Sequence, residues 1–244
     1  EWRQLVDDAD IDCVIAAVPP VLNLEIATAC AKARKPLLLE KPMAVNSGEA
    51  AQICALFAEA SLPLTIGQTL RYNQVIFALR VQIAHLGGLL SFSANQRLEP
   101  APLAWPDEPQ QAGAGVSFHT AVHVFDALRF ITGQEIVRVM ALTRCIHTAR
   151  LEDSLLALIE LENGVTGVVD CSKISPARSG RFEFVGGAGL LQADQIHHAC
   201  DWVKGAKQIP VPLAEPVNTI VPLLKDWDAF LRGDAPNPVP GEEG

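Results

Sequence analysis

The chain has 244 residues, 49% of them apolar, which is enough to bury the core of one large or two modest domains. Its formal net charge of -9 argues against nucleic acid and anionic membrane surfaces as partners, because both require basic patches, and favours a small polar substrate. Six dispersed cysteines form no CxxC pair, and no apolar run approaches the ~18 residues of a membrane span. The sequence therefore predicts a soluble, cytoplasmic protein with reduced thiols.

Short apolar runs alternate with helical patterns in the first part of the chain. Residues 12–18 and 37–39 are apolar without polar alternation, which is typical of strands covered on both faces of a parallel sheet, and 64–67 is a third such run. Apolar side chains at helical spacing predict a helix over 22–33. A second helix is expected after Asn46, which stands three residues before an acid in the spacing of a capping box. This order predicts βαβ units.

Polar residues follow each of these three strands. They are Pro19 and Asn23, then Glu40 and Lys41, then Gln68 and Arg71. Because open α/β sheets bind ligands at the carboxyl ends of their strands, these groups predict a site along one edge of the sheet. Glu40 and Lys41 by themselves are equally consistent with ordinary loop charges. The convergence of three strand ends favours a functional role for Lys41.

The pattern changes near residue 71, and we predict a domain boundary there, with domains 1–70 and 71–244. Longer alternating strands joined by hairpins predict that the second domain is α+β with a large, mostly antiparallel sheet. The expected strands are 89–99, 136–146, 154–161, 165–171, 181–185 and 190–193, and the expected flanking helices are 75–86 and 220–231.

A helix expected over 116–131 carries His119, His123 and Asp126 at positions i, i+4 and i+7. This spacing places all three side chains on one helical face. Imidazoles titrate near neutral pH, so the cluster is a candidate catalytic site. Two histidines at i and i+4 are also a zinc-type spacing, which leaves a metal-dependent hydrolase as an alternative, although Thr120 stands where such enzymes carry their Glu base.

Four motifs in this order resemble the glucose-fructose oxidoreductase and inositol dehydrogenase family, often called Gfo/Idh/MocA. They are the strand and turn at 12–19, Leu38-Leu39-Glu40-Lys41-Pro42, the stretch from Gly113 to Asp126, and Gly241-Glu242-Glu243-Gly244. The resemblance implies an α/β fold in which the C-terminal part of a Rossmann dinucleotide-binding domain precedes the α+β domain. It also implies homo-oligomers formed through the second domain.

By this resemblance the protein is an oxidoreductase that transfers hydride between NAD or NADP and a hydroxyl or carbonyl of a sugar, polyol or related compound. His123 is expected to be the general acid/base and Lys41 to bind the reacting oxygen, with His119 and Asp126 beside them. Arg71, His119 and His123 are expected to bind substrate. Residues expected at the cofactor are Val18, Pro19, Asn23, Glu40, Lys41, Pro42 and Gln68.

The sequence departs from the family pattern at several positions. His119 stands where Asp is common and Ala121 where Gly is common, while Val18 and Asn23 stand for a Thr and a His. The Gly-x-Gly-x-x-Gly turn is absent. We therefore expect a chain truncated at both ends that is inactive and binds NAD(P) poorly by itself, and a non-catalytic paralogue or binding module stays an alternative. The substrate, the choice between NAD and NADP, the reaction direction and the oligomeric state are left open.

Overall fold

The computed structural model describes residues 1–100 and 107–244, and the chain forms two compact units. The first unit contains Glu1–Gln68, Glu108–Gly113 and Ile220–Gly244, and the second contains Thr69–Asp107 and Ala114–Thr219. None of the helices in the described ranges is long and apolar enough to cross a membrane.

The first unit is built on a parallel three-stranded sheet with the order β1-β2-β3. Its strands are β1 (Val14–Ala16), β2 (Leu37–Leu39) and β3 (Leu64–Ile66). Every residue of β2 and β3 is buried, which explains their uninterrupted apolar or uncharged sequences. Ala16, Leu39 and Ile66 lie in one row of the register, so the three strands end at the same level.

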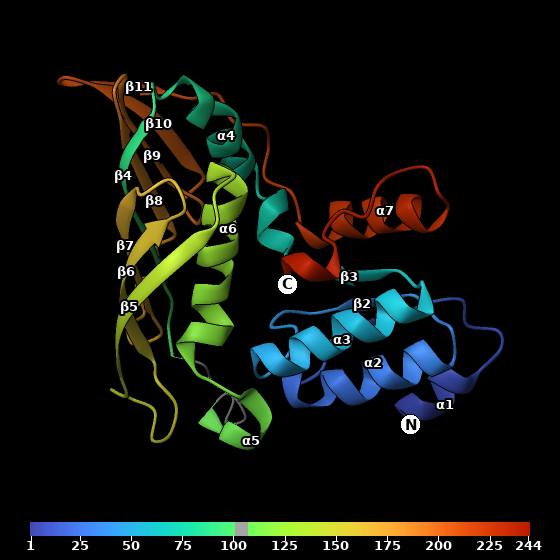
Figure 1. The fold of residues 1–244 in the computed structure, drawn as a ribbon. Coiled ribbons are helices and arrows are strands. Elements are labelled where there is room, and N and C mark those ends of the chain that lie inside the picture. Colours follow the sequence, from blue (N-terminus) through green and yellow to red (C-terminus); the bar gives the residue numbers. More distant parts are fainter. Residues whose placement is uncertain (101–106) are drawn as a thin grey trace. The chain divides into compact units, whose positions relative to one another are not determined.

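The helices of the first unit are α1 (Trp2–Asp7), α2 (Asn23–Lys32), α3 (Ser47–Ala60), α5 (Pro109–Ala112) and α7 (Ile220–Leu231). Helix α2 packs on the sheet and α3 lies beside it (Figure 1). The predicted cap of α3 is confirmed, because the Asn46 side chain accepts a hydrogen bond of 2.9 Å from the Glu49 backbone N–H. The Asn46 amide also donates to Glu49 Oε1 at 3.1 Å.

The last segment of the chain packs within the first unit. The Ile66 N–H donates to the Val239 carbonyl at 3.0 Å, and Asn237 bonds both the Thr65 hydroxyl and the Leu64 carbonyl. Val239 is fully buried. These contacts cover the free edge of β3, so Ile220–Gly244 belong to the first unit, whereas the sequence assigned all of 71–244 to the second domain.

The second unit contains an eight-stranded sheet with the order β11-β10-β9-β8-β4-β7-β6-β5. The strands are β4 (Leu89–Arg97), β5 (Ile136–Arg144), β6 (Ser154–Leu161), β7 (Thr166–Ser172), β8 (Arg181–Gly186), β9 (Gly189–Asp194), β10 (Ala199–Lys204) and β11 (Lys207–Pro210). Neighbouring strands are antiparallel except β4 and β7, which run parallel. The sheet is therefore mixed but mostly antiparallel, as predicted, and β10 and β11 are strands that the sequence analysis missed.

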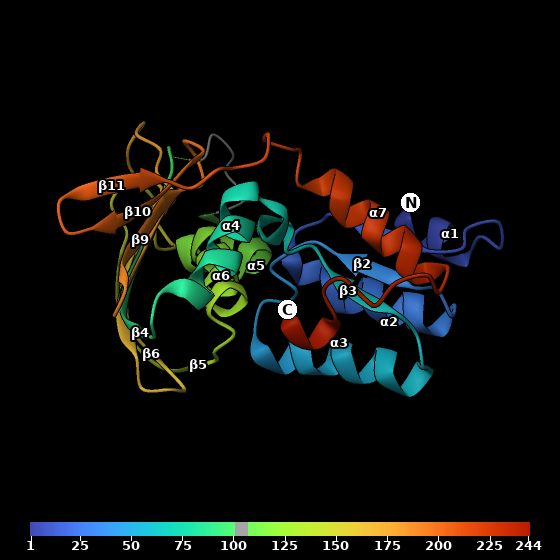
Figure 2. The ribbon, with the colours of Figure 1, turned by 90° about the horizontal axis from the view of Figure 1, so that it is seen from above.

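Helices α4 (Gln74–Gln82) and α6 (Val122–Thr132) cover one face of this sheet (Figures 1 and 2). Their buried residues pack against the inward positions of the strands, among which Phe182 and Phe184 are stacked with ring centroids 6.4 Å apart. Alternate residues of β6 are buried and exposed, as expected for a sheet covered on one side. No helix of this unit covers the opposite face in the described part of the chain (Figure 2).

Candidate functional site

The carboxyl ends of the three strands in the first unit form one edge. The Glu40 N–H donates to the Ala16 carbonyl at 2.9 Å, and the Gly67 N–H donates to the Leu39 carbonyl at 2.7 Å. The predicted cofactor residues of this unit, from Val18 and Pro19 to Gln68, all follow the strand ends that these bonds align. The structure thus brings the predicted polar groups of this unit to one edge of the sheet, whereas Arg71, which was predicted with them, belongs to the second unit.

A short loop after β2 carries Lys41, and the peptide bond between Lys41 and Pro42 is cis. The Asn23 side-chain amide donates to the carbonyls of Pro42 and Met43, both at 3.2 Å, and the Lys41 N–H donates to Glu40 Oε2 at 3.0 Å. Asn23 is only 1% exposed. Its amide therefore holds the loop in place, and a direct contact of Asn23 with a cofactor stays a prediction.

Two buried acceptors along this edge suit a dinucleotide. Among the described residues, nothing donates a hydrogen bond to Asn23 Oδ1 or Gln68 Oε1. A buried acceptor without a donor costs roughly 1–3 kcal/mol, and the ribose hydroxyls and carboxamide N–H groups of a nicotinamide dinucleotide are donors. The chemistry of the residues present therefore fits such a cofactor.

In the second unit, the helix that carries the candidate histidines begins at a close contact with Glu152. The backbone N–H groups of Gly115 and Ser117 donate to Glu152 Oε1 at 3.0 and 3.1 Å, and the Val116 N–H donates to the Glu152 carbonyl at 2.7 Å. A Cβ atom on Gly115 would lie 1.9 Å from that carbonyl oxygen. Only glycine fits there, so Gly115 allows Glu152 to fix the start of the helix.

The first turn of this helix is a π turn, Ser117–Ala121, which continues into α6. The Val122 N–H donates to the Ser117 carbonyl, five residues back. The sequence analysis expected a regular α-helix here, so this detail was wrong. His119 lies in the π turn and His123 in the first turn of α6. The π turn therefore alters the angle between these two residues around the helix axis. Such π turns are frequent at functional sites. We call Ser117–Thr132 the His helix.

Asp126 is engaged by Arg71. The guanidinium Nε lies 3.0 Å from both carboxylate oxygens, and Nη2 lies 2.5 Å from Oδ1. The side chains are only 3% and 11% exposed, respectively. The pair fixes the 3-10 turn Thr69–Tyr72 against the His helix. The roles that the resemblance implied for these two residues, in catalysis and in substrate binding, stay predictions.

His119 lines a cavity of about 120 Å³ at one edge of the large sheet. The residues around it come from the start of the His helix and from segments that follow β4, β5 and β7 or precede β6, because these strand ends lie at the same edge. They are Pro100, Asp107, Gly115, Val116, His119, His147, Thr148, Glu152, Asp153 and Lys173. We call this the His119 cavity. Sequence reasoning missed Asp153 and Lys173. Lys173 directly follows the carboxyl end of β7, which is the signal that pointed to Lys41, whereas Asp153 precedes β6 and lacks that signal.

Two acids that line this cavity, Asp153 and Asp107, accept hydrogen bonds from backbone N–H groups, and these bonds lower their pKa values. Burial by itself raises the pKa of Asp153, but hydrogen bonds of 2.6–3.0 Å from the N–H groups of 146–148 outweigh it and keep the pKa below its usual value. The N–H groups of 149–151 likewise lower the pKa of Asp107. Burial lowers the pKa of Lys173. The loop from β5 to β6 is thus held by Asp153, at its own end, and by Asp107 from the segment before α5.

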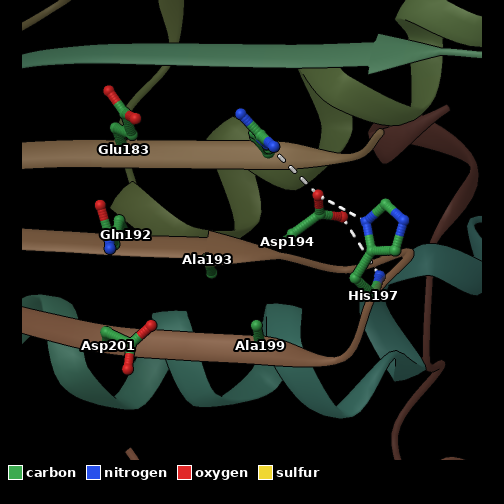
Figure 3. Close-up of a pocket in the computed structure, with 8 residues that line it drawn as sticks. Glu183, Gln192, Ala193, Asp194, His197, Ala199 and Asp201 are labelled. Carbon is green, nitrogen blue, oxygen red and sulfur yellow. Dashed lines mark hydrogen bonds and ion pairs between the residues drawn. The ribbon is translucent and has the colours of Figure 1, made fainter. Parts of the chain in front are cut away.

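A larger cavity, of about 340 Å³, lies on the open face of the sheet over β8, β9 and β10 (Figure 3). Its central residue, Asp194, accepts hydrogen bonds from the backbone N–H groups of Gly180, Ile196 and His197 and from the His197 ring at 2.9 Å. Arg181 Nε approaches at 3.4 Å. These contacts close the turn between β9 and β10, so Asp194 has a structural role.

The metal-site alternative gains no support from the side-chain arrangement. Within residues 1–100 and 107–244, no group of three or more His, Cys, Asp or Glu side chains is placed to hold a metal ion. Asp126, one of the three ligands that the alternative requires, accepts hydrogen bonds from Arg71 instead.

Two family comparisons decide the class of this protein. Residues 1–68 match the family described as "Oxidoreductase family, NAD-binding Rossmann fold", and residues 82–192 match the GFO/IDH/MocA C-terminal domain. The chain belongs to the Gfo/Idh/MocA family. The resemblance drawn from its motifs is thereby confirmed, and so is the predicted fold, a Rossmann domain followed by a domain with a large sheet.

Individual Gfo/Idh/MocA proteins are similar along most of the chain. Inositol 2-dehydrogenase 2 of Saccharopolyspora erythraea is 32% identical over 201 residues, which cover 77% of this chain and 56% of that protein. Myo-inositol 2-dehydrogenase of Thermotoga maritima is 24% identical over 256 residues, covering 99% and 76%. The chain thus spans just over half the length of the first relative. The expected truncation and the expected inactivity of the chain by itself are not borne out by these comparisons.

Among solved structures, levoglucosan dehydrogenase in complex with NADH and levoglucosan superposes with a TM-score of 0.88 at 21% identity, covering 100% of this chain and 76% of that one. At this level of identity the likeness shows the shared fold.

Proposed function

We propose that this protein is an NAD(P)-dependent oxidoreductase that transfers hydride between a nicotinamide cofactor and a hydroxyl or carbonyl carbon of a sugar, polyol or related small molecule. Membership of the Gfo/Idh/MocA family carries the proposal. The names of its relatives, which include two inositol dehydrogenases, and the levoglucosan dehydrogenase complex with NADH support the substrate class and the cofactor.

The mechanism assigns separate tasks to two side chains. Oxidation of a carbinol removes a hydride from carbon and a proton from oxygen, and the nicotinamide supplies the hydride acceptor when it is bound. His123 takes the proton, because an imidazole titrates near neutral pH. Lys41 donates a hydrogen bond to the same oxygen and stabilises its developing negative charge. In the reverse direction His123 returns the proton.

The cofactor is held by the edge of the first unit, through Val18, Pro19, Asn23, Glu40, Lys41, Pro42 and Gln68. The buried acceptors Asn23 Oδ1 and Gln68 Oε1 support this assignment, since a dinucleotide offers the hydroxyl and amide donors that suit them. Either NAD or NADP is compatible with these residues.

The test compares Lys41→Met and His123→Asn with matched controls. Lys32→Met and His85→Asn remove the same groups from exposed helical positions. We expect each site variant to lower kcat/KM by about 10²–10⁴-fold, while the controls retain the wild-type value. Fluorescence titration with NADH and NADPH separates cofactor binding from turnover. Wild-type turnover in either site variant would exclude the role assigned to that side chain. Binding of NADH or NADPH without turnover of any substrate by the wild-type protein would favour the non-catalytic alternative.

We also propose that the protein is a homo-oligomer assembled through the open face of the large sheet. Exposed apolar side chains gather there on adjacent strands, with Met140 opposite Leu158, Leu158 opposite Val168, and Leu142 opposite Leu156. These side chains are 38–74% exposed, and contiguous apolar patches mark interaction sites. Light scattering during size exclusion tests this, because Leu158→Glu should convert the oligomer to a monomer, and a monomeric wild-type protein would refute it.

We also propose that the protein is cytoplasmic. All six cysteines are free thiols, which suits a reducing compartment. Fractionation of cells that express the tagged protein tests it.

A further inference from the structure

The His119 cavity is smaller than a whole ligand site. Pockets that enclose small molecules have volumes of roughly 300–1,000 Å³, whereas this cavity has about 120 Å³. It therefore has room for one functional group of a substrate. The side chains that line it decide which group that is.

Lys173 is the lysine among the residues that line the His119 cavity. It follows β7 directly, and its backbone N–H donates to the Asp153 carbonyl at 2.8 Å, which fixes its position. The residue is partly buried, and its ammonium group makes no ion pair or hydrogen bond with any residue that the structure describes. Lys35 is a buried lysine with a structural role, because its ammonium group donates hydrogen bonds to the carbonyls of Asp8 and Ile11. Lys173 has no comparable acceptor among the described residues.

The three acids of the wall do not serve as counter-ions for Lys173. Asp107 accepts from the N–H groups of 149–151, Asp153 from those of 146–148, and Glu152 from Gly115 and Ser117. Burial is the only cause that shifts the pKa of Lys173, with no described carboxylate close enough to raise it. The three acids are thus engaged by backbone N–H groups, and Lys173 lines the cavity with them.

We propose that Lys173 binds a carboxylate of the substrate, so that the substrate class is a sugar acid or polyhydroxy acid rather than a neutral sugar. This inference rests on the proposed function. An anionic oxygen supplies the charged acceptor that the ammonium lacks among residues 1–100 and 107–244. A phosphate dianion would place a second negative charge beside Asp107 and Asp153, whose pKa values are lowered, and this favours the singly charged carboxylate.

The test measures binding by calorimetry at constant ionic strength and without cofactor. The ligands are matched pairs that differ in the acid group: D-glucuronate and D-glucose, D-galacturonate and D-galactose, and D-gluconate and D-glucitol. The proteins are wild type, Lys173→Met, Lys173→Arg and the control Lys207→Met, which removes the same charge from an exposed position on β11.

We expect at least one acid to bind about tenfold or more tightly than its neutral partner, as for a hydrogen bond between charged groups. Lys173→Met should abolish this preference, while Lys173→Arg and Lys207→Met should retain it. Equal affinity within every pair, no binding of any acid, or a preference that survives in Lys173→Met would overturn the inference. Tighter binding of inorganic phosphate than of every acid would also overturn it.

Two further measurements distinguish carboxylate binding from a structural role of Lys173 and from a failure of the proposed function. Lys173→Met should unfold at the wild-type temperature or above, because it removes a partly buried charge, and a lower temperature would mean that Lys173 is a counter-ion of the wall. Hydride transfer is assayed independently with both members of each pair. Activity on the neutral sugars alone overturns only the carboxylate inference. Binding of an acid without hydride transfer to any substrate overturns only the proposed function.

Discussion

Replacing Asp126 by Asn tests the ion pair that joins the His helix to Arg71. Arg71 Nε lies 3.0 Å from both oxygens of Asp126, and the two side chains are 11% and 3% exposed. Removal of one partner leaves the other charge buried, which typically costs about 3–5 kcal/mol. We therefore expect Asp126→Asn and Arg71→Met each to lower the free energy of unfolding by roughly that amount.

The double variant separates loss of the pair from loss of packing. Replacing both partners by apolar residues of similar volume is often nearly neutral. The variant Arg71→Met with Asp126→Leu should thus lose much less stability than the two single losses combined. The control is the exposed pair of Asp228 and Arg232, whose side chains are 61% and 69% exposed. Asp228→Asn should cost less than ~1 kcal/mol.

Urea unfolding at neutral pH, followed by tryptophan fluorescence and by circular dichroism, gives these free energies. The reasoning fails if either single variant loses less than about 1 kcal/mol, the range of a surface pair. It also fails if the losses of the two single variants add up in the double variant, because additivity would show that the side chains are not coupled.

Three further predictions concern other parts of the chain. Gly115→Ala should destabilise the protein by ~3 kcal/mol because its Cβ would meet the Glu152 carbonyl. The control Gly164→Ala, at a position with open space and a φ of +82°, should cost only about 1 kcal/mol in urea unfolding. Similar losses of stability in the two variants would contradict the clash. The pKa of Asp153 is lowered on folding, so the wild-type protein should be more stable than Asp153→Asn at pH values above the unfolded-state pKa of about 3.9. This difference in the free energy of unfolding should disappear as the pH falls through the folded-state pKa. A difference that stays constant in acid would refute this. Burial raises the pKa of Cys171 to about 12, so a thiol reagent should modify the exposed Cys145 in the native protein and reach Cys171 only after unfolding; equal rates would contradict the burial.

Local patterns predicted most of the elements. The apolar run 37–39 is β2, the Asn46 cap begins α3, and the alternation over 154–161 is β6. These predictions succeeded because each depends on neighbouring residues, whose spacing is fixed by the geometry of a helix or strand. The edge strand β11 was missed because such a local pattern is absent from it. All its residues are exposed, so no buried face imposes an alternation of apolar and polar residues.

The sequence by itself determined the family and the edge of the first sheet where Lys41 lies, because parallel strands place their carboxyl ends together. Only the tertiary structure decided that Arg71 pairs with Asp126, that a π turn carries His119, and that Lys173 lines a cavity beside it. Arg71 and Asp126 are 55 residues apart in the chain. Such contacts depend on strand register and on the path of the backbone, and the spacing of residues within one segment carries no information about either.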